Sequence, residues 1–232
     1  MAIEHSFIIP LYNEEDNIIA TVQTIEKASQ DISLNYEIII IDDCSLDQSV
    51  SRVKAMLTER DKIILHCHKQ NQGFAAAYRS GINLARGNSC QYIPSDNVIS
   101  WEDLTRLLMA SRSTPVVLQY CLNPRERKKL RNFISHNYTR ILNKIHQRDI
   151  YYYNGLNIYP RSFLLENLDT SESFAFQAEL ALKAIKSFSY QQVPIHCKFK
   201  DDTSSALSLT NILRVAHFII NEARKELFKG VK

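Results

Sequence analysis

The chain has 232 residues, of which 45% are hydrophobic and 23% are charged, a composition typical of a globular protein with a sizeable core. Residues 1–100 contain 13 acidic and 8 basic residues and residues 101–232 contain 12 and 20, which gives net charges of −5 and +8. The longest run without a charge, Ser113–Pro124, is too short for a membrane span of about 18 apolar residues. Acids at Glu4 and Glu14–Asp16 surround the first apolar run, so we expect no secretory signal.

The cysteine and glycine patterns exclude further classes. Five cysteines occur without a CxxC spacing, which favours reduced thiols in a cytoplasmic protein over a zinc site or a disulfide framework. The sequence has neither GxGxxG nor GxxxxGK[ST], which argues against a dinucleotide-binding Rossmann site and a P-loop.

Residues 1–100 alternate between short apolar runs and amphipathic segments. We predict strands at Ser6–Pro10, Glu37–Ile41, Ile63–Cys67 and Cys90–Ile93. The intervening helices are predicted to follow an N-cap at Asn13 and then to cover Leu46–Thr58 and Gly73–Ala85. This alternation predicts a mostly parallel sheet with helices on both faces, in a single α/β domain.

The second half is less regular. We predict helices at Trp101–Ser111, Pro124–Gln147, Phe174–Lys186 and Leu209–Phe228. Predicted strands lie at Pro115–Cys121 and Tyr190–His196, the latter at an edge because it contains a proline. Tyr151–Tyr159 is expected to be an aromatic strand or loop.

The last helix, Leu209–Phe228, has an apolar stripe formed by Ile212, Val215, Ala216, Ile219 and Ile220. Most amphipathic helices cover a core, and this is the favoured interpretation. The alternative is a helix on a membrane surface, which its arginines and lysines would suit.

Polar residues follow three predicted strands, at Pro10–Glu14, Asp42–Asp47 and Pro94–Asn97. In open α/β sheets, ligands bind beyond the carboxyl ends of the strands. Asn13, Ser45 and Asp47 also suit helix capping, which we favour for Ser45. Three such clusters at one sheet edge nevertheless predict a binding site.

Two of these clusters lie in motifs that resemble a known family. Phe7–Glu14 (FIIPLYNE) together with Ile39–Asp47 (IIIDDCSLD) resembles the opening of family-2 inverting glycosyltransferases, which have the GT-A fold. Ala85–Gly87 leading into Tyr92–Asp96 is similar to the approach to the DxD metal motif of that family. The resemblance covers roughly residues 5–110. It implies a nucleotide-binding half at residues 1–100 and an acceptor-binding half at residues 101–232.

The resemblance implies specific roles. Pro10, Tyr12 and Glu14 would line the nucleoside pocket, and Asp42 would accept a hydrogen bond from the base, with Asp43 the less favoured reader. Asp96 would bind Mg²⁺ or Mn²⁺ at the diphosphate of a nucleotide-sugar. Pro94 stands where the family has the first Asp of DxD, which puts metal dependence in question although one carboxylate can suffice for Mg²⁺.

A narrower likeness joins this chain to dolichyl- and polyprenyl-phosphate sugar synthases. It rests on Arg131 and Ser135, on Asp149 before Asn154-Gly155, on Phe176–Leu180 and on Val193–Ile195. The late motif of those enzymes would fall on Lys200–Ala206, where Ser205 alone matches outright.

The segment Arg125–Arg148 contains eight basic residues and one acid. The likeness implies that Arg131 and Ser135, together with Arg127 on the same helix face, hold the phosphate of a lipid acceptor. A solvated helix face is the simpler alternative. Nucleic-acid binding is a third interpretation, which the few aromatic residues here do not favour.

We therefore expect a glycosyltransferase that moves a sugar with inversion from a nucleotide-sugar to a polyprenyl phosphate at the cytoplasmic face of a membrane. A soluble glycan or protein hydroxyl is the alternative acceptor; it would need a general base, for which Glu179 is the candidate. A non-catalytic nucleotide-sugar-binding protein is a further alternative.

Overall fold

The computed structural model describes residues 2–126, 129–168, 175–198 and 209–228. In these residues one sheet contains seven strands in the order β3-β2-β1-β4-β6-β5-β7. The strands are β1 (His5–Leu11), β2 (Tyr36–Asp42), β3 (Ile63–Cys67), β4 (Ser89–Tyr92), β5 (Val116–Cys121), β6 (Ile158–Pro160) and β7 (Tyr190–Ile195).

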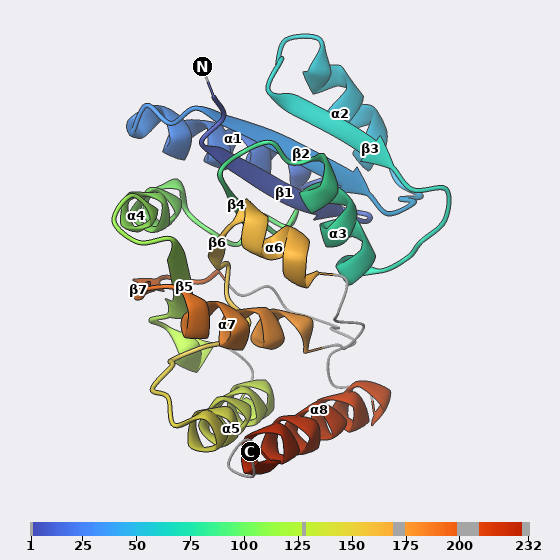
Figure 1. The fold of residues 1–232 in the computed structure, drawn as a ribbon. Coiled ribbons are helices and arrows are strands. Elements are labelled where there is room, and N and C mark those ends of the chain that lie inside the picture. The colour runs from blue at the N-terminus through green and yellow to red at the C-terminus, as the bar shows by residue number, and fades with distance from the viewer. Residues whose placement is uncertain (1, 127–128, 169–174, 199–208, 229–232) are drawn as a thin grey trace.

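Helices cover both faces of this sheet (Figure 1). One face carries α1 (Ile18–Asp31), α2 (Ser49–Leu57) and α4 (Trp101–Ser111). The other carries α3 (Phe74–Leu84), α6 (Arg161–Asn167) and α7 (Phe176–Ser187). The remaining helices are a short 3₁₀ turn at Pro124–Glu126, α5 (Lys129–His146) and α8 (Leu209–Phe228).

The first four strands are parallel, with β1 between β2 and β4. Alternate side chains enter opposite cores: Ile8 joins the cluster under α3, whereas Phe7 and Ile9 join the cluster under α1 and α4. A strand buried on both faces needs such a continuous apolar run. The predicted α/β fold with a mostly parallel sheet is confirmed.

The sheet changes direction after β4. Strand β6 pairs antiparallel with both β4 and β5, and β7 then pairs parallel with β5 at the edge of the sheet. Pro194 lies in this edge strand, as predicted. Of the segment Tyr151–Tyr159, only Ile158 and Tyr159 belong to a strand.

Two predicted helix starts are wrong. The first helix begins at Ile18 with Asn17 as its N-cap, because Asn13 has a positive φ of 52° and its side chain serves another loop. The basic segment is not one α-helix from Pro124, since Pro124–Glu126 form a 3₁₀ turn, and among the described residues α5 covers Lys129–His146.

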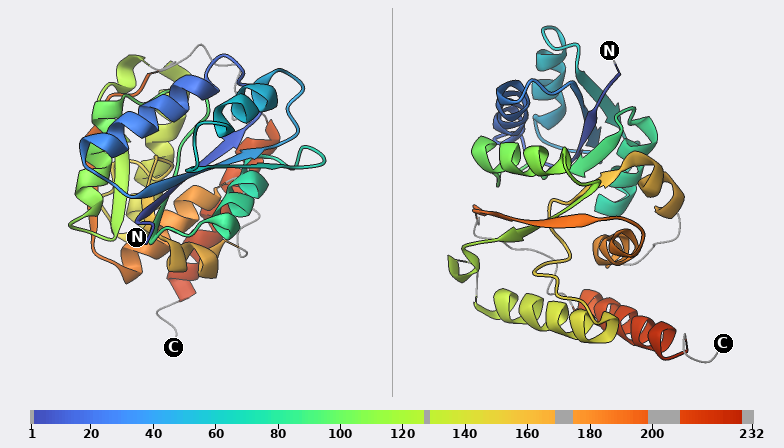
Figure 2. Two further views of the ribbon diagram at one scale, coloured as in Figure 1. Left: turned by 90° about the horizontal axis from the view of Figure 1, so that it is seen from above. Right: turned by 60° about the vertical axis from the view of Figure 1, so that its left-hand side comes forward.

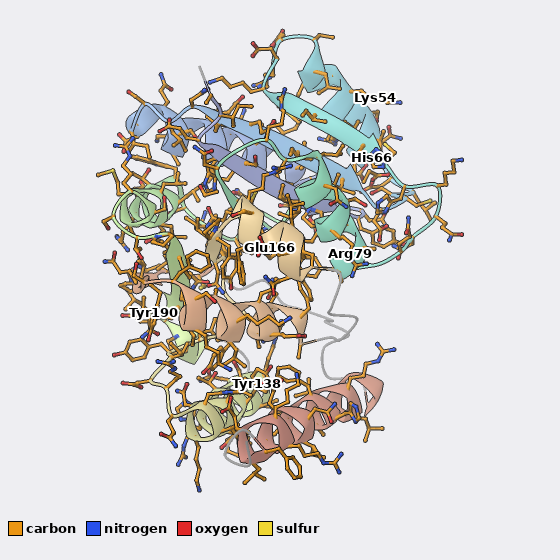
Figure 3. The ribbon with its side chains drawn as sticks, in the orientation of Figure 1. Lys54, His66, Arg79, Tyr138, Glu166 and Tyr190 are labelled. Atoms are coloured by element: carbon orange, nitrogen blue, oxygen red, sulfur yellow. The ribbon has the colours of Figure 1, made fainter. Side chains whose placement is uncertain are left out.

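Helices α5 and α8 lie side by side at the end of the molecule farthest from α2 (Figures 1 and 2). Tyr138 and Leu142 of α5 and Phe218 of α8 are buried in the core cluster, and Figure 3 labels Tyr138 on α5. Among the helices of the described ranges, none combines the length and the hydropathy of a membrane-spanning segment.

His146 joins these two helices. Its Nε2 lies 3.2 Å from a carboxylate oxygen of Glu222, and its Nδ1 lies 3.0 Å from one of Glu226. Burial, followed by the charge of Lys186, lowers the pKa of His146, and the two glutamates oppose that shift. The contact thus joins the two helices through ionisable side chains.

Candidate functional site

The loops that follow β1 and β2 are joined by hydrogen bonds between side chains and backbone. The backbone N–H of Asn13 donates to Ser45 Oγ (3.0 Å), and the Asn13 Oδ1 atom accepts from the N–H of Leu46 (2.8 Å). The N–H of Glu15 donates to Asp47 Oδ2 (3.0 Å). Ser45 therefore does not cap the helix that follows it, contrary to our favoured interpretation, because its hydroxyl holds the neighbouring loop.

Asp47 also holds the neighbouring loop, and its pKa reflects these contacts. The pKa of its carboxyl lies below the usual value, because hydrogen bonds from Ser49 and from the N–H of Glu15 outweigh the opposing effect of partial desolvation. An ionised Asp47 thus stabilises the paired loops.

The turns after β1, β2 and β4 share an uncommon backbone conformation. Asn13, Cys44 and Asn97 have φ values of 52°, 67° and 56°, in the left-handed region that non-glycine residues rarely adopt. Residues held in this region often cluster at binding sites. Their position at the carboxyl ends of adjacent strands marks this sheet edge as the candidate site.

Asp42 and Asp43 are both buried, at 3% and 4% exposure, but their carboxylates have different partners. Asp43 accepts from the backbone N–H groups of Gln72 (2.9 Å) and Gly73 (2.7 Å) at the start of α3. Both oxygens of Asp42 lie 3.3 Å from the backbone N–H of Ser45. These long contacts leave Asp42 more hydrogen-bonding capacity than Asp43 has.

The predicted nucleoside-pocket residues lie on the same edge. Pro10 is in β1, and Tyr12, one residue after the strand, is 47% exposed. The Glu14 carboxylate accepts from the side-chain amide of Asn17 (2.7 Å), and the Glu14 backbone O accepts from the N–H of Ile18 (3.0 Å). Glu14 thus shapes the turn that starts α1.

Asp96 lies in the loop after β4, and its negative charge adds to burial in raising the pKa of Tyr92. Ser95 O accepts from Thr21 of α1 (2.9 Å), and Asn97 Oδ1 accepts from Thr24 (3.1 Å). Asp96 supplies the one carboxylate of this loop, which suits a cation held mainly by phosphates and water. In the part of the chain that the structure describes, no cluster of three or more His, Cys, Asp or Glu residues could hold a metal ion.

Glu179 lies in the first turn of α7, with its carboxylate 3.1 Å from the ammonium group of Lys183. The side chain is 15% exposed. Glu179 thus forms an ion pair, which is the alternative to its interpretation as a general base.

A groove of about 950 Å³ lies between α5 and the carboxyl end of β5. Ser135 lines it, and the half-buried Arg131 lies one helical turn earlier, outside the lining residues that the structure describes. Arg127 and the stretch Lys200–Ala206 lie outside the described residues.

Two groove cations, Lys129 and Arg140, were not among our candidates. They share one side of α5 with Asn132 and His136, a spacing of three or four residues that could have identified them. Opposite this helix, the rings of Tyr120 and Tyr151 pack with their centres 4.6 Å apart. The groove thus combines positive charge with aromatic surface.

Helices α5 and α8 also expose large apolar side chains. We call these residues the apolar face: Leu130, Phe133, Ile134 and Ile141 of α5, with Leu213, Ile220, Leu227 and Phe228 of α8. Among the described side chains of the two helices, every exposed charged one is basic, namely Lys129, Arg140, Lys144, Arg214, Arg224 and Lys225. Large apolar side chains exposed on two neighbouring helices, together with exposed charges of one sign, are typical of an interaction site.

Comparison with known proteins identifies the family. The profile of Glycosyl transferase family 2 matches residues 6–168, so the chain belongs to this family. A dolichyl-phosphate beta-glucosyltransferase from Dictyostelium discoideum is 32% identical over 109 residues, which are 44% of this chain and 33% of that protein. An undecaprenyl-phosphate 4-deoxy-4-formamido-L-arabinose transferase from Aeromonas hydrophila is 33% identical over 107 residues, 46% of this chain and 33% of the relative. The similarity thus spans about a third of the length of these relatives.

Solved structures show the same GT-A fold. S. aureus TarS in complex with UDP-GlcNAc has a TM-score of 0.65 at 18% identity, covering 95% of this chain and 66% of that one. Glucosyl-3-phosphoglycerate synthase from Mycobacterium tuberculosis, in complex with Mn²⁺, UDP and phosphoglyceric acid, has a TM-score of 0.65 at 16% identity and covers 96% and 78%. The predicted family and fold are confirmed.

Proposed function

We propose that this chain transfers a sugar, with inversion, from a nucleoside diphosphate sugar to a polyprenyl phosphate at a membrane surface. The observation that carries this proposal is the basic, aromatic groove along α5, which adjoins the apolar face of α5 and α8. The two polyprenyl- and dolichyl-phosphate transferases among its relatives support the same acceptor class.

The donor would bind at the edge where β1, β2 and β4 end. Tyr12 presents an exposed ring beside Pro10 on which a base can stack. Asp42 would accept a hydrogen bond from an N–H group of that base, because Asp43 is engaged with the start of α3. Glu14 would keep the loop after β1 in place through its contacts with Asn17.

Asp96 is the residue that would hold Mg²⁺ or Mn²⁺. Such a cation, when bound, would neutralise the charge on the departing diphosphate. Pro94 stands where the family has the first Asp of DxD and offers no second carboxylate. The remaining ligands would therefore be phosphate oxygens and water.

The acceptor phosphate would bind in the groove, near Ser135, Lys129 and Arg140, with Arg131 and Arg127 as further candidates. A lipid phosphate is already anionic and can attack the anomeric carbon without losing a proton. The groove residues then need only bind and orient it.

The apolar face would contact the membrane. Its large side chains suit the boundary between headgroups and acyl chains, and each neighbouring lysine or arginine contributes about 1 kcal/mol at an anionic surface. This arrangement would place the groove next to the lipid that carries the acceptor.

The proposal is tested by incubating the purified chain in detergent with undecaprenyl phosphate, MnCl₂ and a panel of UDP- and GDP-sugars, and by measuring released nucleotide. We expect lipid-stimulated release with one donor. Arg140→Ala should reduce it at least tenfold, whereas Lys144→Ala, an exposed cation of α5 outside the groove lining, should leave it within twofold. Lack of lipid stimulation with every donor would refute the acceptor assignment.

A hydroxyl acceptor is the second candidate, and the Glu179 carboxylate, 15% exposed in the first turn of α7, is the group that would act as its general base. Glu179→Gln separates the two acceptors: near-normal turnover supports a phosphate nucleophile, and lost turnover supports a general base.

Asp96→Ala addresses the non-catalytic alternative. Slow hydrolysis of the nucleotide-sugar by the wild type, abolished in this variant, would eliminate that alternative.

A further inference from the structure

His68 follows β3 and is buried beside Asp43. Its Nδ1 lies 2.7 Å from Asp43 Oδ1, and its Nε2 lies 2.9 Å from the hydroxyl of Ser80 on α3. The Nδ1–H group donates to the carboxylate, and Nε2 shares the second hydrogen bond with the hydroxyl. The segment after β2, the segment after β3 and helix α3 are thereby joined through one side chain.

The same carboxylate organises the loop from residue 68 to residue 73. Asp43 accepts from His68 and from the backbone N–H groups of Gln72 and Gly73, and its own backbone O accepts from the side-chain amide of Asn71 (3.2 Å). A buried carboxylate is stabilised by its donors, and the loss of one of these three weakens that stabilisation. His68 therefore determines how firmly Asp43 holds this loop.

The network lies directly beside the proposed base reader. Asp42 precedes Asp43, and its backbone O accepts from the N–H of His68 (2.8 Å). A shift of the 68–73 loop would thus move the backbone of Asp42. We infer that His68 is a positioning residue of the nucleotide site; this inference rests on the proposed function. Held between Asp43 and Ser80, it fixes the loop and strand end that orient Asp42, and so sets nucleotide affinity.

The experiment measures the Kd of UDP, and of GDP if UDP does not bind, to the full chain by calorimetry with MnCl₂. His68→Leu removes both ring contacts, and we expect it to raise Kd about tenfold. His68→Asn places a donor near the position of Nδ1 and should restore Kd to within threefold of the wild type. His217→Gln is the matched control, because His217 is an exposed histidine of α8, and it should leave Kd unchanged.

Ser80→Ala removes only the hydrogen bond between the Ser80 hydroxyl and His68 Nε2. It is the second variant, for the case in which His68→Leu does not fold. We expect it to raise Kd about threefold while the melting temperature remains within a few degrees of the wild-type value. If His68→Leu and Ser80→Ala both bind the nucleotide with wild-type affinity, the inference is overturned and the proposed function stays intact. If His68→Leu does not fold, wild-type affinity in Ser80→Ala alone has the same meaning. If neither nucleotide binds the wild type, the proposed donor site itself is refuted, and the inference with it.

Discussion

At the scale of single residues, His5 is a titratable group inside the core at the start of β1. Its side chain is buried, and its Nδ1 lies 2.7 Å from the hydroxyl of Ser89 on the neighbouring strand β4. Burial lowers the pKa of His5 to about 3, so the folded protein keeps this imidazole neutral over most of the acid range.

This burial predicts a pH-dependent free energy of unfolding. Below pH 6.5 the unfolded chain binds a proton at His5 and the folded chain does not, so stability falls as the pH drops from about 6.5 to about 3. The slope from this single group is at most about 1.4 kcal/mol per pH unit. His5→Asn can donate near the position of Nδ1 but does not titrate, and urea unfolding between pH 7 and pH 4.5 should show a shallower loss for this variant. Parallel pH profiles of the two proteins would contradict the assignment.

Residue types indicated where the site lies, but not the partner of each side chain. The Pro10–Glu14 and Asp42–Asp47 motifs lie, as expected, at one edge of the sheet, where β1 and β2 end. The family resemblance favoured Asp42 over Asp43 as the base reader, but residue types alone could not give the physical reason, because the difference between their carboxylates arises from backbone N–H groups about 30 residues further along the chain. Lys129 and Arg140 have a regular spacing on α5 that could have identified them, but the sequence does not show that β5 forms the second wall of their groove.

At the scale of elements, α3 packs directly on β1 through Gly81. A Cβ added there would overlap the Cγ2 methyl of Ile8 and lie 3.4 Å from Cγ1 of Ile41. Both isoleucines are fully buried in strands, so neither can easily move aside.

Gly81→Ala should therefore destabilise the protein although alanine favours helices. Overpacking costs about 1–3 kcal/mol, and the gain of about 1 kcal/mol in helix propensity offsets only part of that. Urea unfolding would measure the change. Asn83→Ala, two residues later at an exposed position of α3, is the control and should be neutral or slightly stabilising. Equal stability of Gly81→Ala and the wild type would indicate looser packing.

The parallel half of the sheet was predictable because apolar runs in β1, β2 and β3 alternate with amphipathic helices. Strand β6 and helix α6 were not predicted as separate elements, since β6 has three residues and α6 has seven. Their positions follow from pairing with β4 and from packing on α3, which lie far away in the sequence. Tertiary contacts, rather than local periodicity, determine such short elements.

At the scale of the whole molecule, the −5 and +8 halves of the chain contribute different surfaces. The strand ends with their carboxylates belong to the acidic half, and α5 and α8 with their exposed cations belong to the basic half. The charge separation fits a protein that faces a lipid surface with one end, as proposed above.

Binding to vesicles tests this orientation. We expect the chain to bind vesicles containing 30% phosphatidylglycerol and to dissociate as salt rises, because exposed charges are screened. Ile220→Glu combined with Leu227→Glu should weaken binding at least tenfold, since each buried Leu or Ile contributes about 1.5–3 kcal/mol. Met109→Glu alters an exposed apolar residue of α4 and should have little effect. Equal loss in both variants would argue against a dedicated face.

The strand order also constrains how the chain is made. Strand β4 ends at Tyr92, and the strand that covers its open edge, β6, begins at Ile158. At about 5–20 residues per second, a ribosome needs roughly 3–13 s to synthesise the intervening segment. During that interval the nascent first half carries a strand with unpaired backbone groups, which is a template for pairing with other chains. Translation pauses between these two strands would lengthen this vulnerable state and increase the demand for chaperones.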